Sequence, residues 1–191
     1  DDVNVSLIAK DADGYKLISR EALSNYKKVL EALKKKGFTK ELVKHTANSA
    51  GILYHPDTYF DMVRLGVMIY GFYPTGIYEE DGPLEPVLAL KARVAQVKDI
   101  PAGATISYGC TFTADKPMTI AIVTAGYADS YPRSLSNKGV YAMIEGQKCM
   151  QIGRICMDMC MFDVTGKDVH EGGEVILYGK GGMPLDKIAE F

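Results

Sequence analysis

Hydrophobic side chains recur with a helical period near the start of the chain. Between residues 19 and 36 they are spaced three and four positions apart, which places them on one face of an amphipathic helix. Ser19 suits the N-cap of this helix and Gly37 suits its end. The residues that form the hydrophobic face are Leu23, Tyr26, Leu30 and Leu33. The pattern therefore predicts a helix over about residues 19–36.

Shorter hydrophobic runs lie on both sides of this helix. Residues 4–9, 41–45 and 65–71 have the length and composition of strands, and the last run is hydrophobic enough to be buried on both faces. Residues 47–54 and 56–63 have helical character. Strands that alternate with helices are typical of a parallel α/β sheet. The first half of the chain is therefore predicted to be an α/β domain.

The pattern changes in the middle of the chain. Residues 72–86 are rich in glycine, proline and acidic side chains, which indicates a boundary between two domains, 1–84 and 85–191. The second domain carries its hydrophobic residues in short runs separated by turn signals such as Glu145–Gln147, without a sustained helical period. This pattern is typical of a β barrel or a β sandwich.

Composition narrows the classes of function. The chain has 191 residues, 47% hydrophobic content and a formal net charge of −2, as expected of an ordinary soluble globular protein. This charge provides no field that would attract nucleic acid or an anionic membrane. No hydrophobic run reaches the roughly 18 residues of a membrane-spanning helix, and the first residues show no signal peptide. We therefore expect neither a nucleic-acid nor a membrane partner.

The cysteines and histidines argue against a metal site. Four cysteines occur without a CxxC pair, and the chain has three histidines, so the ligand spacing of a structural zinc site is missing. Unpaired thiols are typical of a reducing compartment. We expect no metal ion and a cytoplasmic protein.

Candidate chemistry in the first domain centres on Arg64, which precedes the predicted strand 65–71. A buried charge is costly unless an anionic or electron-rich partner lies beside it. Asn48 and Ser49 begin a predicted helix and Gly66 permits close backbone approach, a combination that suits a phosphate at the ends of parallel strands. A capping serine and an edge arginine would explain the same residues without any ligand.

Two motifs of the second domain carry candidate polar groups. Tyr108 follows the strand-like stretch ISYG and would act as an acid or a base, or else fill one end of a barrel. The loop GYADSYPR carries Tyr127 and Arg133, which would line whatever the loop covers. A well hydrogen-bonded turn is the alternative for this loop.

A third motif, GRICMDM, places Arg154 and Asp158 in an otherwise hydrophobic run. Such charges usually face solvent or pair across a strand, and Met157 would fill the core. No spacing in the chain matches a Ser-His-Asp triad, a phosphate-binding loop or a dinucleotide fingerprint. Those enzyme classes are therefore excluded.

Five separated motifs occur in an order that resembles the C-terminal half of the alanine racemase family. The set is more specific than any single motif, and it covers about residues 45–159. The motifs are HTANSAG, VRLGVMIYG, SYG followed by TFTA, GYADSYPR and GRICMDM. The resemblance implies the last units of an α/β (TIM-type) barrel followed by a mostly β, barrel-like domain.

The resemblance also implies pyridoxal 5'-phosphate as the cofactor. In this family the residues that match Ser49, Gly66 and Val67 hold the cofactor phosphate, and the arginine that matches Arg64 donates a hydrogen bond to the pyridine nitrogen. Guanidinium is effectively always protonated, so it cannot hand the ring a proton. The implied cofactor-binding residues are His45, Asn48, Ser49, Arg64, Gly66 and Val67.

Racemisation of L- and D-alanine for peptidoglycan synthesis uses, in this family, two bases on opposite faces of the α-carbon. One base is a lysine and the other is a tyrosine from the partner subunit, which Tyr108 matches. The resemblance thus implies a head-to-tail homodimer. Met157 matches a residue near the substrate carboxylate. The residues that match the entrance of the active site are Tyr127, Arg133, Arg154 and Asp158.

The chain departs from the family pattern at the cofactor lysine. The family motif has the form KAxAYGHG, and the nearest counterpart here is Lys10 in AKDADGY, which lacks the Gly-His-Gly. We therefore expect the lysine to lie outside this chain and the chain alone to be inactive. The alternatives are a serine or broad-specificity racemase, and a non-catalytic module for cofactor binding or dimerisation.

Overall fold

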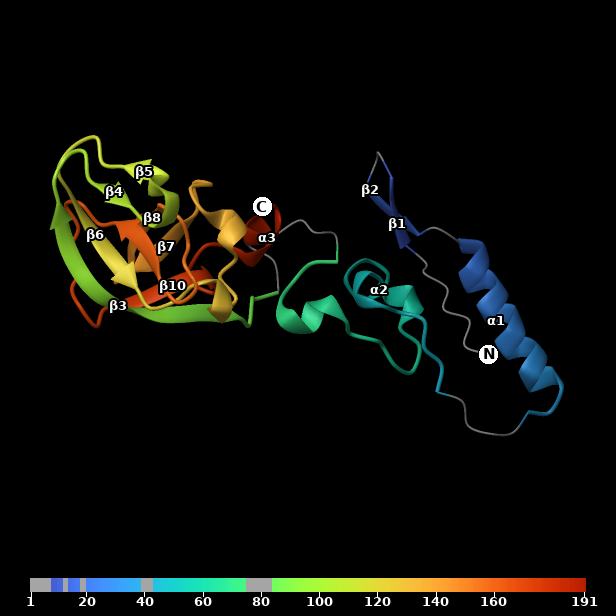
Figure 1. Ribbon diagram of the computed structural model, residues 1–191. Coiled ribbons are helices and arrows are strands. Elements are labelled where there is room, and N and C mark those ends of the chain that lie inside the picture. The colour runs from blue at the N-terminus through green and yellow to red at the C-terminus, as the bar shows by residue number, and fades with distance from the viewer. Residues whose placement is uncertain (1–7, 12–13, 18–19, 39–42, 75–83) are drawn as a thin grey trace. The chain divides into compact units, whose positions relative to one another are not determined.

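The amphipathic spacing near the start of the chain forms helix α1 (Arg20–Lys35) in the computed structural model (Figure 1). The predicted helix is thus confirmed; Leu23 on its hydrophobic face is buried, and Lys34 and Lys35 occupy the last turn, where the helix dipole favours them. The structure describes residues 8–11, 14–17, 20–38, 43–74 and 84–191. The predicted N-cap Ser19 lies outside these residues.

The strand predicted at residues 4–9 is present in its described part, residues 8–9, and continues to Asp11. Strands β1 (Ile8–Asp11) and β2 (Gly14–Leu17) pair in antiparallel fashion, with Lys10 opposite Tyr15. The residues on either side of positions 12–13, which lie outside the described residues, are thus paired through their backbones. Tyr15 is an aromatic residue with a high strand propensity, which favours the extended backbone of β2.

After α1, two further predicted helices are present at least in part, and two predicted strands are not observed. Helix α2 (Ser49–Tyr54) lies in the run predicted at 47–54, and the 3-10 helix η1 (Pro56–Thr58) covers only the start of the run predicted at 56–63. The strand predicted at 41–45 is absent from its described part, residues 43–45, and the strand predicted at 65–71 is wrong. In its place lies a second 3-10 helix, η2 (Val67–Tyr70).

The run 65–71 is also exposed where burial on both faces was predicted. Leu65 is 53% exposed and Ile69 is 60% exposed. A short hydrophobic run is compatible with either a strand or a helix, and only a paired neighbour makes it a strand. No described strand pairs with this run, so its backbone closes local hydrogen bonds, from Ile69 N to Gly66 O and from Gly71 N to Met68 O.

Six strands of the second half close into a β barrel, in the order β10-β3-β6-β9-β8-β7 (Figure 1). The predicted β class of this region is confirmed. All of the neighbouring strands are antiparallel, and β10 pairs with both β3 and β7. The strands are β3 (Ala89–Ile100), β6 (Met118–Val123), β7 (Tyr141–Ile144), β8 (Gln147–Ile152), β9 (Cys160–Asp163) and β10 (Glu174–Gly179).

Short elements accompany the barrel. Strands β4 (Thr105–Ile106) and β5 (Phe112–Thr113) pair with each other, and helix α3 (Leu185–Ala189) follows β10. The predicted turn between β7 and β8 is present: Glu145 and Gly146 both have positive φ, and Ile144 pairs with Gln147. Two consecutive residues with positive φ match the right-handed twist of the strands that they join.

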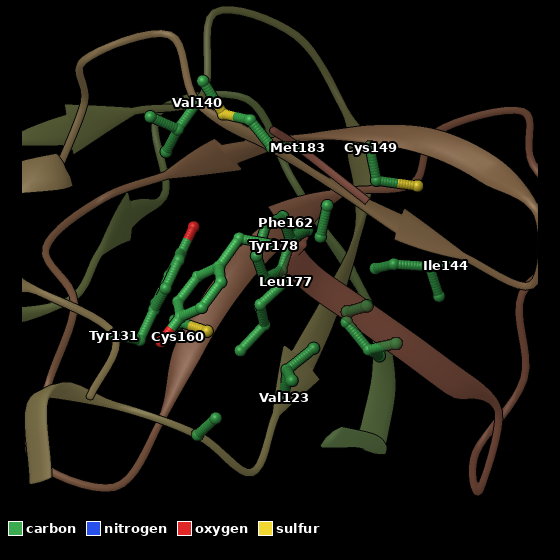
Figure 2. Close-up of a cluster of buried hydrophobic side chains, with 14 of the residues drawn as sticks. Val123, Tyr131, Val140, Ile144, Cys149, Cys160, Phe162, Leu177, Tyr178 and Met183 are labelled. Carbon is green, nitrogen blue, oxygen red and sulfur yellow. The ribbon is translucent and has the colours of Figure 1, made fainter. Parts of the chain in front are cut away.

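Two hydrophobic clusters form the core of the barrel unit. The larger cluster fills the barrel and includes Val123, Ile144 and Phe162, each fully buried (Figure 2). A second cluster, which includes Ile106 and Ile152, lies where the β4–β5 pair packs on the barrel. Because the first unit, Asp1–Glu85, and the second, Pro86–Phe191, are separately compact, the residues of each candidate site are positioned by their own unit.

Candidate functional site

In the first unit, two segments lie side by side and bring His45 next to Arg64. The Asp61 N–H donates to Lys44 O and the Arg64 N–H donates to Ala47 O, each over 2.9 Å. The Lys44 ammonium lies 2.8 Å from a carboxylate oxygen of Asp61. Hydrogen bonds from Lys44 lower the pKa of Asp61, so this carboxylate keeps its charge at neutral pH. These contacts fix the two backbones on which the candidate cofactor residues stand.

The half-buried guanidinium of Arg64 contacts an imidazole nitrogen. Its Nη1 lies 2.6 Å from His45 Nδ1. Because a guanidinium only donates, His45 Nδ1 must accept, which puts the proton of the neutral ring on Nε2. The contact restrains the orientation of Arg64 without neutralising its charge, so the guanidinium remains suited to an electron-rich acceptor.

Ser49 joins helix α2 to the start of η2. Its hydroxyl accepts a hydrogen bond from Gly66 N–H over 3.0 Å, and the residue is buried. A Cβ added at Gly66 would lie 3.3 Å from Ser49 Oγ, so a side chain there would press on the hydroxyl. The cap of α2 is Asn48, whose Oδ1 accepts from Gly51 N–H over 2.9 Å. The explanation of Ser49 as a capping serine is therefore wrong.

This arrangement leaves donors free for an anion. A hydroxyl that accepts one hydrogen bond still has its own proton to donate. The first N–H groups of a helix have no partner within that helix, and both α2, which begins at Ser49, and η2, which begins at Val67, start here. Ser49 Oγ and the backbone around Gly66 can therefore hold a phosphate group.

The register of the barrel strands brings the three other motifs to one end of the barrel. Val123 at the end of β6 pairs with Cys160 at the start of β9, and Ile152 at the end of β8 pairs with Met161. The loops that follow β6 and β8 therefore lie together. Their backbones are joined by hydrogen bonds from Tyr127 N to Cys156 O and from Ala128 N to Met157 O, each 3.0 Å long.

The third loop, which holds Tyr108, is attached to the same place. The hydroxyl of Ser107 donates to Arg154 O over 2.7 Å. Tyr108 begins a 3-10 turn, η3 (Tyr108–Cys110), and its side chain is 70% exposed. The alternative of a tyrosine that fills a barrel end is wrong, because the phenol projects outward from the loops.

The residues predicted to line an entrance lie around this tyrosine loop. Tyr127 and Met157 are exposed, so Met157 is not the core residue that its hydrophobic neighbours suggested. Arg154 lies in a loop, not on a strand, which removes the predicted pairing with Asp158 across a strand face. Arg133 and Asp158 are exposed on the same group of loops. The four predicted entrance residues and Met157 thus lie on the loops that follow β6 and β8.

Sequence reasoning missed residues that hold these loops together. A Cβ added at Gly126 would lie 2.2 Å from Cys156 O, so the two backbones cross with no room for a side chain. Asn137 accepts from Gly153 N–H over 2.8 Å and donates to Thr111 Oγ1 over 3.1 Å. Gly126 belongs to the motif GYADSYPR, whereas nothing in the local sequence indicated the role of Asn137.

Two titratable groups beneath the loops are unsuited to proton transfer. Burial raises the pKa of Tyr131 far above its ordinary value, and burial likewise raises the pKa of the Cys160 thiol. Tyr131 stacks on Tyr178 with ring centroids 6.4 Å apart (Figure 2). Both groups stay neutral at ordinary pH, whereas the phenols of Tyr108 and Tyr127 on the loops are exposed to a ligand.

The described residues hold neither a cluster of metal ligands nor a helix that could cross a membrane. Among them, His, Cys, Asp and Glu side chains do not gather in groups of three or more. The helices in that part of the chain are too short or too polar to cross a bilayer.

Comparison with known proteins identifies relatives of both units. Residues 87–191 match the family model "Alanine racemase, C-terminal domain", and residues 7–74 match "Alanine racemase, N-terminal domain". The chain is 40% identical over 176 residues to an alanine racemase of Desulforamulus reducens, an alignment that covers 91% of this chain and 47% of that protein. It thus spans about half the length of this relative.

Solved structures agree with this assignment. The chain resembles the alanine racemase of Clostridium difficile 630 in complex with cycloserine, with 36% identity and a TM-score of 0.76, over 89% of this chain and 45% of that one. It also resembles the Bartonella henselae alanine racemase with covalently bound pyridoxal phosphate, with 36% identity and a TM-score of 0.68, over 87% of this chain and 46% of that one. With its second unit matched throughout by a family model, the chain belongs to the alanine racemase family.

Proposed function

We propose that this chain forms part of a pyridoxal 5'-phosphate-dependent alanine racemase that interconverts L- and D-alanine for cell-wall synthesis. The observation that carries the proposal is the paired contact in the first unit, Ser49 Oγ to Gly66 N and Arg64 Nη1 to His45 Nδ1. It combines a site for a phosphate with a fixed donor for a ring nitrogen. The remaining units of the α/β barrel would come from outside these 191 residues.

The residues of the first unit fit the cofactor. Ser49 Oγ, with the backbone at Gly66 and Val67, would hold the phosphate, and Asn48 would keep Ser49 in place as the cap of α2. Arg64, oriented by His45, would donate to the pyridine nitrogen and keep its own proton. When bound, the cofactor supplies an electron-withdrawing ring that acidifies the α-proton of the amino acid.

An arginine at the ring nitrogen makes well-placed bases necessary, because it leaves the ring uncharged. Tyr108 would be one base, acting on one face of the α-carbon in the active site of a neighbouring subunit. Its exposure of 70% supports a role in trans within a head-to-tail homodimer. The second base would be a lysine outside this chain. The four free cysteines are consistent with a cytoplasmic location.

The other exposed loop residues would shape access to the reaction centre. The backbone of Met157 would contact the substrate carboxylate, with alanine or a similar small amino acid as the substrate. The loop crossing at Gly126 would hold Met157 beside Tyr127. The residues that would line the entrance are Tyr127, Arg133, Arg154 and Asp158.

The proposal is tested in a replacement chimera, in which this chain takes the place of the matching segment of the Desulforamulus reducens alanine racemase. Replacing Tyr108→Phe removes the proton-transferring group and should lower kcat by about 10²–10⁴-fold, the range for a general acid or base. Because the equilibrium constant of racemisation is one, kcat/KM must fall equally in both directions. The α-deuterium isotope effect should rise for one enantiomer alone.

The matched control for this experiment is Tyr141→Phe. Tyr141 lies on β7, outside the three loops, with its ring under the Lys148 ammonium. This variant should keep the kcat of the chimera. Cofactor absorbance should be the same in both variants. Unchanged turnover in Tyr108→Phe would rule out the assigned base and leave a non-catalytic module as the explanation.

The isolated chain provides a second test. Because Lys10 lacks the family's surrounding motif, residues 1–191 with added pyridoxal 5'-phosphate should show no alanine racemisation above the cofactor alone. The measurement is the optical rotation of L-alanine over time. Turnover by the isolated chain would instead identify Lys10 as the second base.

A further inference from the structure

The residue that precedes Tyr108 has an unusual backbone conformation. Ser107 has φ of 64° and ψ of −178°. This region of backbone space is occupied almost only by glycine, because a Cβ meets its own neighbouring peptide groups there. A serine in such a conformation persists when the surrounding structure holds it. The contacts of Ser107 therefore indicate what the conformation is for.

The side chain of Ser107 is tied to the loop that carries Arg154. Its hydroxyl donates to Arg154 O over 2.7 Å, and Cys156 Sγ lies 3.3 Å from Ser107 Oγ. Gly153 makes room for this contact: a Cβ added there would lie 3.2 Å from Ser107 Cβ and 2.9 Å from Ile106 Cγ2. Ser107 is thus pressed against this loop as well as bonded to it.

The guanidinium of the same arginine lies beside Gly109, the residue that follows Tyr108. Gly109 has φ of 73°, and a Cβ added there would lie 3.1 Å from Arg154 Nη1. Arg154 therefore contacts the chain on both sides of Tyr108, through its carbonyl oxygen at Ser107 and through its guanidinium at Gly109. Because the Tyr108 ring itself is mostly exposed, its direction depends on these backbone contacts.

We propose that Ser107 is a positioning residue, whose hydroxyl bond to Arg154 O holds the backbone that aims the Tyr108 phenol. This inference rests on the proposed function, in which Tyr108 transfers the proton. A glycine would adopt the same conformation without strain, but it would leave the peptide free to rotate. The serine keeps the strained conformation because its hydroxyl is bonded to the neighbouring loop.

Two substitutions separate positioning from stability. Ser107→Ala loses the hydroxyl and keeps the strained Cβ, so it should lower both Tm and kcat of the chimera. Ser107→Gly loses the hydroxyl and relieves the strain, so it should leave Tm equal or higher while kcat still falls by about 10- to 100-fold, as expected when a reacting group is misplaced by about 1 Å. KM should change less than threefold in both. The isotope effect should rise for the same enantiomer as in Tyr108→Phe.

A purely structural role predicts another outcome. If Ser107 only stabilises the loops, turnover should follow Tm and Ser107→Gly should recover the kcat of the parent chimera. That recovery would overturn the proposal. Thr165→Ala is the matched control, because Thr165 Oγ1 accepts from Thr119 N over 3.0 Å at the opposite end of β6. It removes a hydrogen bond between a hydroxyl and the backbone, here with the hydroxyl as the acceptor, and should leave kcat unchanged.

A measurement without turnover distinguishes failure of this inference from failure of the proposed function. Fluorotyrosine is placed at position 108 of the 191-residue chain and observed by fluorine NMR. The parent should show one narrow resonance, and both Ser107 variants should show broadened or multiple resonances, whereas Thr165→Ala should not. Identical narrow spectra in all variants would refute positioning by Ser107. An inactive parent chimera would refute the proposed function alone.

Discussion

The two units of this chain use their hydrophobic side chains in opposite ways. In the barrel, Phe162, Ile144 and Val123 are fully buried inside strands that close on themselves. In the first unit, Ile69 and Tyr70 are each 60% exposed, and the described structure is held mainly by polar contacts such as Arg64 with His45. The barrel carries its own core, whereas the segment with the candidate cofactor residues exposes hydrophobic side chains.

Cutting the chain between the two units is the strongest test of this contrast. Residues 86–191 should fold alone and unfold cooperatively in urea, because the closed barrel contains both hydrophobic clusters. Residues 1–85 alone should show no cooperative transition. Far-UV circular dichroism against urea concentration measures both fragments. A cooperative transition in residues 1–85 would show that the exposed hydrophobic side chains do not prevent this unit from folding alone.

A pair of alanine substitutions tests the contrast residue by residue. Phe162→Ala should lower the free energy of unfolding of the barrel by about 3–5 kcal/mol, because the removed ring leaves a cavity in a closed core. Ile69→Ala should change stability by less than about 0.5 kcal/mol, as is usual at exposed positions. Chemical denaturation of the 191-residue chain measures both. Equal losses would mean that Ile69 is packed in solution.

A much smaller effect than that of Phe162→Ala is expected at a polar group inside the barrel core. The Tyr131 hydroxyl is buried and makes no hydrogen bond to a described protein atom. Removing an unsatisfied buried group is favourable, so Tyr131→Phe should leave stability at pH 7 unchanged or raise it by about 1 kcal/mol. Urea denaturation measures the change. A loss of several kcal/mol would reveal a partner for the hydroxyl.

The same variant should alter the response to alkali. Burial raises the pKa of Tyr131 above its unfolded value of about 10, so the unfolded chain ionises first as pH rises. Its contribution to stability is complete below pH 10 and is lost progressively above it. Tyr131→Phe should therefore lose stability less steeply above pH 10 than the parent. Cys160, whose pKa is also raised, should account for part of the remaining slope.

The local sequence pattern predicted correctly the elements whose structure depends only on their own residues. The helical spacing that includes Leu23 gave α1, and the turn at Glu145 and Gly146 gave the β7–β8 hairpin. The run 65–71 was predicted wrongly because its hydrophobicity suits a strand or a helix equally, and its choice depends on whether another strand pairs with it. Pairing is set by chain that lies far away in sequence.

The same distinction applies to the candidate site. Residue types and their order placed Ser49, Arg64 and Tyr108 among the candidates. The hydrogen bond from Ser107 to Arg154 O could not be predicted from the sequence. It joins residues 47 positions apart, and its acceptor is a backbone carbonyl, which every residue has. The exposure of Met157 was missed for a similar reason, since its flanking hydrophobic residues made it look like part of a strand core.

The crossing of the two loops at Gly126 limits which substitutions this end of the barrel can tolerate. Backbone lies where a Cβ would stand, so even a methyl group would separate the chains that carry Tyr127 and Met157. Under the proposed function, neighbouring side chains could vary and change the width of the entrance to the active site. Position 126 could not vary with them, because any side chain there would meet backbone.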